Sequence, residues 1–79
     1  MIISEHALGR MSSKGISEEE VKKCVYEGVL KTRNVVNGEM RQVTELQMKD
    51  KTLVTIHTFD GLERRVITVY LLARKRWQR

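Results

Sequence analysis

The sequence contains no proline, a single cysteine, and only one tryptophan, two tyrosines and one phenylalanine as aromatic residues. Because Cys24 is the only cysteine, no disulfide can form within the chain. With only His6 and His57 beside it, no spacing of zinc ligands is present, so we expect neither a bound metal nor another cofactor. Without proline, glycine and asparagine must mark the turns.

Long apolar runs are also missing: no window approaches the roughly 18 consecutive apolar residues of a membrane-spanning helix. The opening MIISEHALGR has neither a basic leader nor the apolar core of a signal peptide. Apolar residues make up 41% of the chain and charged residues 32%, the balance of a globular domain. A chain of 79 residues has material for one hydrophobic core. We therefore expect one cytoplasmic domain over residues 1–79, away from membranes, with residues 74–79 as a basic end.

The net charge of +5 is unevenly distributed. Residues 1–61 hold equal numbers of basic and acidic side chains, so the whole excess lies in residues 62–79. A positive field localised in this way attracts RNA, the ribosome or an acidic protein partner. The alternative is that the basic end only keeps the chain in solution.

Two short helices are predicted near the start of the chain. Ser4 is a good N-cap for a helix that stops at Gly15, and the residues between them show helical spacing of apolar side chains. Ser17 begins a second helix, Glu20 completes a capping box with it, and Gly28 ends the helix.

After Gly28 the apolar period changes from 3.6 to 2, which is typical of strands. The segments VLKTRNVV and EMRQVTELQMK flank Asn37-Gly38, the strongest short signal for a hairpin. TLVTIHTF and RRVITVYLL flank Asp60-Gly61 and predict a second hairpin. We therefore expect an α+β domain in the order α-α-β-β-β-β, with both helices on one face of a four-stranded antiparallel sheet. The other face stays partly open to a ligand.

Several strand positions are polar where the pattern would allow an apolar residue: Arg33, Arg41, His57, Arg65 and Tyr70. Which of them share a face depends on the length of the loop around Asp60-Gly61, because a slip of one residue reverses a strand. For His57 the alternative is a solvent-facing or cross-strand role, and for Arg65 it is an ion pair with Glu39, Glu45 or Glu63.

The stretch SEHALGRM places His6 and Arg10 four positions apart, and therefore on the same side of the first helix. His6 lies in the first turn, where the helix dipole disfavours its charged form, so its ring is suited to accept a proton. The alternative is structural: His6 bonds a backbone carbonyl, and Arg10 pairs with Glu5 or Glu45.

The whole pattern resembles a family of small prokaryotic domains of unknown function. These open with Ser-x-His-Ala-x-x-Arg-Met, carry Gly-Ile-Ser before the second helix, and close on an Arg-Val-Ile-Thr strand, as SEHALGRM, GIS and RVIT do here. That family is similar to the BrnT-like and RelE-like ribonuclease toxins of toxin-antitoxin operons, and the resemblance implies their two-helix, curved-sheet fold. It also implies that His6, Arg10 and Arg65 occupy characteristic polar positions. Lys14, where arginine is common, and the ending RKRWQR depart from the pattern.

Metal-independent RNA cleavage needs a base, an acid, and cations around the phosphorane. We expect His6 or His57 to move protons, Arg10 and Arg65 to hold the phosphate, and Tyr70 to donate a proton or stack on a base. This hypothesis requires His6, Arg10 and Arg65 to meet around one anion-binding pocket. Further RNA contacts are expected from the remaining strand and C-terminal cations: Arg33, Arg41, Arg64, Arg74, Lys75 and Arg76.

The leading hypothesis is a toxin-like domain acting on RNA or the ribosome, a metal-independent endoribonuclease of a toxin-antitoxin system. Its partners would include an antitoxin, and a homodimer is a further expectation. The alternative is a noncatalytic module that binds protein or nucleic acid. A third hypothesis is self-association through an exposed edge strand.

Overall fold

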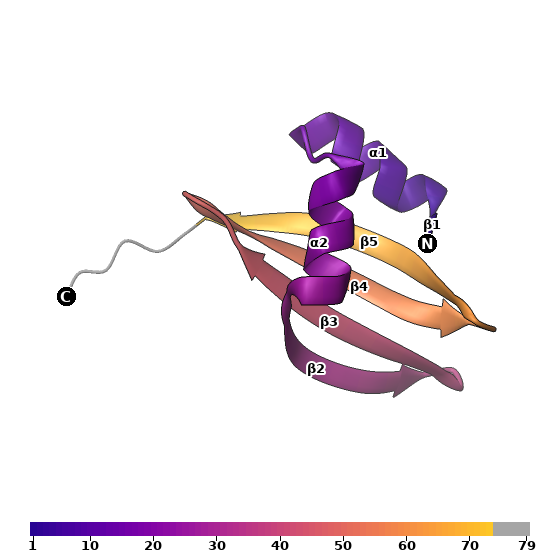
Figure 1. Cartoon of the computed structure of the whole chain (residues 1–79). Helices are drawn as coiled ribbons and strands as arrows, with labels where there is room; N and C mark the ends of the chain where they lie inside the picture. The colour runs from indigo at the N-terminus through magenta and orange to yellow at the C-terminus, as the bar shows by residue number, and fades with distance from the viewer. Residues whose placement is uncertain (74–79) are drawn as a thin grey trace.

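The computed structural model describes residues 1–73 of the chain. These residues form two helices and five strands, with the bounds Ile2–Ile3 for β1, Glu5–Lys14 for α1, Glu18–Glu27 for α2, Val29–Val36 for β2, Glu39–Gln47 for β3, Lys51–Asp60 for β4 and Glu63–Ala73 for β5. Both helices lie on one face of the sheet, with α1 against β5 and α2 against β3 and β4 (Figure 1). We call this face the helix side and the opposite one the outer face.

The sheet has five strands in the order β1-β5-β4-β3-β2 and is mixed. Strands β2 to β5 form an antiparallel meander, whereas β1 pairs with β5 in parallel through Ile2 and Ile3. The predicted α+β class, with two helices on one face, is confirmed, and the four predicted antiparallel strands are present, but the sheet has a fifth strand, β1, that was not predicted. A strand of two residues shows no alternation that a sequence pattern can reveal.

The helices begin and end at the predicted residues. The Ala7 N–H donates to Ser4 Oγ at 3.0 Å, and Gly15 ends α1 in the left-handed region at φ 69°. Ser17 and Glu20 form the reciprocal capping box, with hydrogen bonds of 2.9 and 3.1 Å. These bonds satisfy N–H groups that the first turn of a helix leaves without intrahelical partners.

The two predicted hairpins, β2-β3 and β4-β5, turn at the same end of the sheet, which we call the hairpin end (Figure 1). Asn37 and Gly38 have φ of 51° and 77°, as a type I′ turn requires. The second turn begins one residue later than the predicted pair suggests, since β4 continues through Asp60 and β5 starts at Glu63. Gly61 supplies the positive φ there, at 69°.

Strand β5 has one residue more than β4 at one point in their pairing. Ile56 is opposite Thr68, but His57 is opposite Val66, so Ile67 forms a bulge in β5. Side-chain alternation along β5 therefore changes phase at Ile67, and this decides the face of every residue beyond it.

The hydrophobic core lies between the helices and the sheet. It consists of Ala7, Met11, Ile16, Val21, Cys24, Val25, Leu53, Val66 and Val69. Cys24 lies on the buried stripe of α2, beside Val21 and Val25. Within residues 1–73, neither helix has the length and apolar character needed to cross a membrane.

Candidate functional site

The residues predicted from the sequence to form one site lie in three places. His6 and Arg10 are on α1, while the strand residues divide between the two faces of the sheet. The structure therefore does not bring Arg10 and Arg65 together around one pocket. The predicted contacts from Arg74, Lys75 and Arg76 lie outside the described residues.

The motif on α1 ties that helix to the outer edge of β5. Arg10 Nε donates to the Val69 carbonyl and Ser4 Oγ to the Ile67 carbonyl, each at 2.8 Å. Both carbonyls lie beyond the short stretch of β5 that pairs with β1. Arg10 is thus held by backbone rather than by either of the carboxylates considered above. His6, on the same helix, is exposed.

The outer face carries Arg65, Arg41 and Tyr70. Arg65 Nη2 lies 2.8 Å from Glu39 Oε2, and Arg41 Nε lies 3.1 Å from Glu39 Oε1, so two guanidinium groups share one carboxylate. The Glu39 ion pair is one of the alternatives that the sequence left open for Arg65. Tyr70 reaches the same face because the bulge precedes it, and it lies opposite Val54.

The helix side carries Arg64, which contacts an imidazole and two aromatic rings. Its Nη1 lies 3.2 Å from His57 Nδ1, and its guanidinium carbon lies 4.3 Å from the centre of the Phe59 ring and 5.3 Å from that of Tyr26. The two aromatic residues are 52% and 56% exposed, whereas His57 is only 1% exposed. We call Tyr26, His57, Phe59 and Arg64 the Arg64 cluster.

A buried chain of hydrogen bonds continues from the Arg64 cluster into the core. A guanidinium can only donate, so His57 Nδ1 accepts and the ring proton lies on Nε2. Nε2 then donates to Thr44 Oγ1 at 3.3 Å, and Thr44 Oγ1 lies 2.7 Å from Thr55 Oγ1, a hydrogen bond in which either hydroxyl can donate. Thr55 Oγ1 in turn lies 3.6 Å from Cys24 Sγ. Arg64 thus sets the tautomer of His57.

Burial keeps both ionisable groups of this chain neutral. The pKa of His57 falls from 6.5 to about 4, first because the ring is removed from water and second because Arg64 is positively charged. Burial also raises the pKa of the Cys24 thiol, which therefore stays protonated. A protonated thiol is a poor nucleophile, and a His57 ring bonded at both nitrogens is not open to a substrate.

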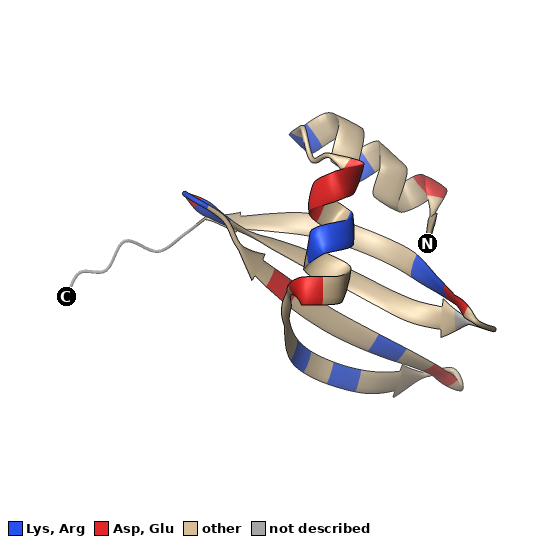
Figure 2. Ribbon diagram, in the orientation of Figure 1, with Lys and Arg blue, Asp and Glu red and all other residues tan. Residues whose placement is uncertain are grey.

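The surface around the Arg64 cluster is extended by β2 and β3. Arg33 lies opposite Gln42, and Gln42 lies opposite His57, so these three side chains share the helix side. Figure 2 shows that β2, β3 and β5 each carry basic residues. Arg33 and Arg64 thus place two cations on the helix side of the sheet, with Arg64 beside the exposed aromatic rings.

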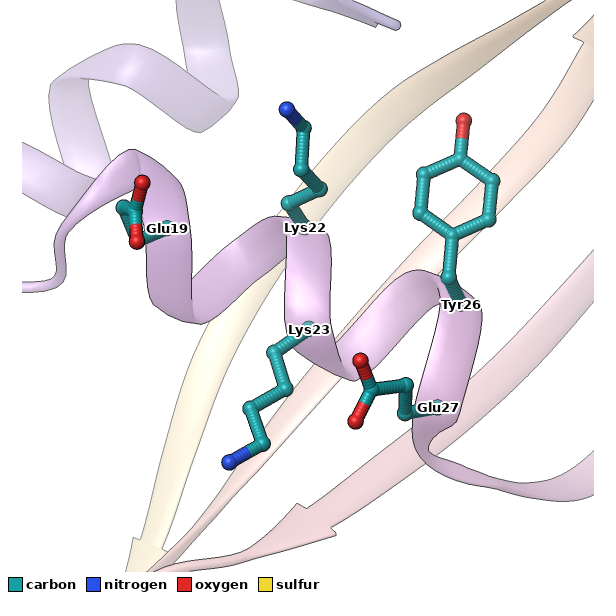
Figure 3. Close-up of a pocket in the computed structure, with 5 residues that line it drawn as sticks. All are labelled: Glu19, Lys22, Lys23, Tyr26 and Glu27. Atoms are coloured by element: carbon teal, nitrogen blue, oxygen red, sulfur yellow. The ribbon is translucent and has the colours of Figure 1, made fainter.

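A separate hollow lies on the outward surface of α2. It is lined by Glu19, Lys22, Lys23, Tyr26 and Glu27. In Figure 3, Lys22 and Tyr26 extend to one side of the helix and Lys23 to the other. All the lining residues belong to one helix and carry charges of both signs, so the hollow offers neither enclosing walls nor a common field for a ligand. We therefore place the candidate site at the Arg64 cluster, which shares only Tyr26 with the hollow.

Sequence reasoning missed Tyr26 and Phe59 as site residues. Phe59 lies directly opposite Arg64 across the second hairpin. This pairing follows from a two-residue turn at residues 61–62, so the correct turn would have revealed it. The position of Tyr26 has no such local signal, because α2 and β5 are distant in sequence.

Comparison with known proteins gives one match. Residues 3–71 match the model of the family described as a domain of unknown function, DUF4258. No curated protein and no solved structure gives a significant match. Within the described residues, no group of three His, Cys, Asp or Glu side chains is placed to hold a metal ion.

Proposed function

The chain belongs to the DUF4258 family, and we propose that it acts on RNA, with the Arg64 cluster as the surface that binds a single strand. The observation that supports this proposal is a guanidinium set against two exposed aromatic rings on the basic helix side of the sheet. Aromatic rings bind unpaired bases by stacking, and a guanidinium binds phosphate or stacks on a base.

The cluster is also prepared for binding before a ligand arrives. The guanidinium of Arg64 is fixed from beneath by the buried His57, so little side-chain freedom remains to be lost on binding. Stacking contributes about 1–3 kcal/mol per base in proteins that bind single strands. Two exposed rings and one fixed cation therefore suit a short run of unpaired nucleotides.

The finer proposal is a metal-independent endoribonuclease of the toxin-antitoxin type, similar to BrnT-like and RelE-like toxins. In it, Arg64 holds the scissile phosphate and stabilises charge on the phosphorane, a role that Arg65 fits less well because it shares Glu39 with Arg41. His57 positions Arg64 and does not exchange protons with RNA. Proton transfer falls to exposed groups, for which the imidazole of His6 and the hydroxyl of Tyr26 are the candidates.

The first test is binding of a fluorescent oligouridine by the full chain. We expect Arg64→Ala, and Tyr26→Ala with Phe59→Ala, to weaken binding roughly tenfold or more. Arg41→Ala is the matched control, because it removes one positive charge from the same end of the sheet on the opposite face, and it should change affinity by at most about threefold. Equal losses in Arg64→Ala and Arg41→Ala, or no binding by the wild type, would contradict the proposal.

The second test separates cleavage from binding. Total RNA and translating ribosomes are incubated with the wild type, His6→Ala and Tyr26→Phe, with and without EDTA. Cleavage that persists in EDTA and decreases in either variant supports the endoribonuclease. Intact RNA in every sample, together with binding that depends on Arg64, leaves the noncatalytic RNA-binding module as the function.

A further inference from the structure

Strand β2 is an edge of the sheet whose eight residues are all exposed. Its apolar side chains are unusually accessible: 64% for Val29, 43% for Leu30, 64% for Val35 and 38% for Val36. An edge strand also directs alternate backbone N–H and C=O groups outward, where they can pair with another extended chain. Backbone groups and apolar side chains are therefore presented along one edge.

Exposed apolar side chains lie on both faces of β2. Leu30 and Val35 lie opposite Thr44 and Met40 and so face the helix side. The apolar residues at the two ends of the strand, Val29 and Val36, face outward on the other side of the sheet, since they lie opposite Glu45 and Glu39. An added strand would therefore gain apolar contacts above and below the sheet, at both ends of β2.

The middle of β2 is basic. Lys31 and Arg33 are its charged residues, and within residues 1–73 no hydrogen bond or ion pair engages either of them. Their charge is therefore available to an incoming chain. Carboxylates opposite this segment would complete cross-strand ion pairs, which stabilise a sheet.

The same charges oppose self-association through β2. In a twofold antiparallel pairing centred on Thr32, Lys31 would lie opposite Arg33 of the second copy. A pairing centred on Arg33 would place Arg33 opposite Arg33 of the second copy, and a pairing centred on Lys31 would do the same for Lys31. Like charges directly opposite one another destabilise a sheet, so a second copy of the chain is a poor partner for the whole strand.

We propose that β2 binds an extended acidic segment of another protein, which adds to the sheet as a sixth strand. The segment carries carboxylates in its middle and apolar residues at both ends, matching the apolar-basic-apolar order of VLKTRNVV. In reverse the order is again apolar-basic-apolar, but the cations are fourth and sixth instead of third and fifth, so an antiparallel segment pairs its carboxylates with them only when it is displaced by one residue. This surface contains none of the four residues of the Arg64 cluster, although Arg33 also extends the surface around that cluster, and it does not rest on RNA binding.

The test uses the capped peptide Val-Val-Glu-Thr-Glu-Thr-Val-Val, a version with both glutamates changed to lysine, and an acidic version N-methylated at alternate residues. We expect the acidic peptide to bind the full chain and to slow hydrogen exchange of β2 amides. The lysine peptide should bind roughly tenfold more weakly, because repulsion replaces two cross-strand ion pairs. The N-methylated peptide keeps the charges but loses backbone pairing, so it should bind no better than the lysine peptide.

Variants of the protein complete the test. Lys31→Glu with Arg33→Glu should reverse the preference between the two charged peptides, and should leave the thermal midpoint of unfolding nearly unchanged. Lys14→Glu with Lys22→Glu changes the net charge equally but lies on the helices, and it should keep the preference for the acidic peptide. The proposal would be overturned if the acidic and lysine peptides bound equally well, or if the N-methylated peptide bound as tightly as the acidic one. Protection of β2 amides by self-association alone, or by oligouridine alone, would overturn it as well.

Discussion

Arg64 and Arg65 are adjacent in the chain and carry the same guanidinium, yet β5 directs them to opposite faces of the sheet. On the outer face Arg65 and Arg41 both contact Glu39, so a carboxylate offsets part of their charge. On the helix side Arg64 contacts a neutral imidazole and two aromatic rings. The difference shows that the working charge of an arginine depends on its partners, and it favours Arg64 as the residue that meets an anion.

The largest expected effect is a fall in the free energy of unfolding in acid. It follows because the folded protein keeps His57 neutral beside Arg64, whereas the unfolded chain can protonate it. The folded-state pKa of about 4 lies below the ordinary value of 6.5, so the unfolded chain gains this proton first as the pH falls. The stability from this group is fully present above pH 6.5 and is lost between pH 6.5 and about 4, an effect of about 3 kcal/mol. Urea unfolding between pH 7.5 and 4.5 measures it.

His57→Gln provides the control for this prediction. Glutamine retains hydrogen-bonding groups but does not titrate, so the variant should lose less stability over the same pH range than the wild type. An identical pH dependence in the two proteins would show that the imidazole beside Arg64 is not the acid-sensitive group.

Removal of each arginine in turn compares the two faces directly. Arg64→Ala takes the donor from His57 Nδ1 and uncovers two aromatic rings, which should lower the free energy of unfolding by about 1–2 kcal/mol. Arg65→Ala breaks a partly exposed ion pair that Arg41 can still supply, so its cost should stay below about 1 kcal/mol. Chemical unfolding at pH 7 gives both values, and a larger loss in Arg65→Ala would reverse the comparison.

Changing the shared carboxylate of Glu39 should make the outer face more like the helix side, because Glu39 then no longer offsets arginine charge there. Glu39→Gln removes the negative charge between Arg41 and Arg65, and RNA affinity should then rise by roughly twofold to threefold in low salt and less in high salt. Oligouridine binding at two salt concentrations measures this change. Glu27→Gln, on α2, is the matched control, and an equal gain there would indicate a general charge effect.

The smallest effect is expected from Tyr70, which lies on the face of Arg65. Tyr70→Phe should leave RNA binding and any cleavage within about twofold of the wild type, because the hydroxyl is remote from the Arg64 cluster. The binding and cleavage assays described above apply unchanged. A loss as large as that of Arg64→Ala would move the candidate site to the outer face.

Much of the fold could be predicted because its signals are local. The caps at Ser4 and Ser17 and the turn at Asn37-Gly38 depend on residues within a few positions of one another. The same holds for membership in a family of domains of unknown function, which two short motifs indicated. Strand β1 escaped prediction because its two residues form a strand only through pairing with β5.

The site was harder to predict because its geometry depends on one extra residue. Strict alternation along β5 would place Tyr70 on the same face as Arg64, but the bulge at Ile67 moves it to the face of Arg65. The contact between His57 and Arg64 follows instead from the two-residue turn at residues 61–62, which sets Phe59 opposite Arg64 and His57 opposite Val66. No property of a single residue in the sequence reveals a bulge, so the face of Tyr70 could not be predicted.

The hydrogen bonds from Ser4 and Arg10 to β5 join residues 63 and 59 positions apart. The first helix therefore acquires its anchor only after the last strand of the described fold has been synthesised. Until then the hydroxyl and the guanidinium have no carbonyls to bond on that strand, and the early segment lacks its final support. We infer that this domain folds in one late step, once β5 has left the ribosomal tunnel, rather than gradually from its N-terminus.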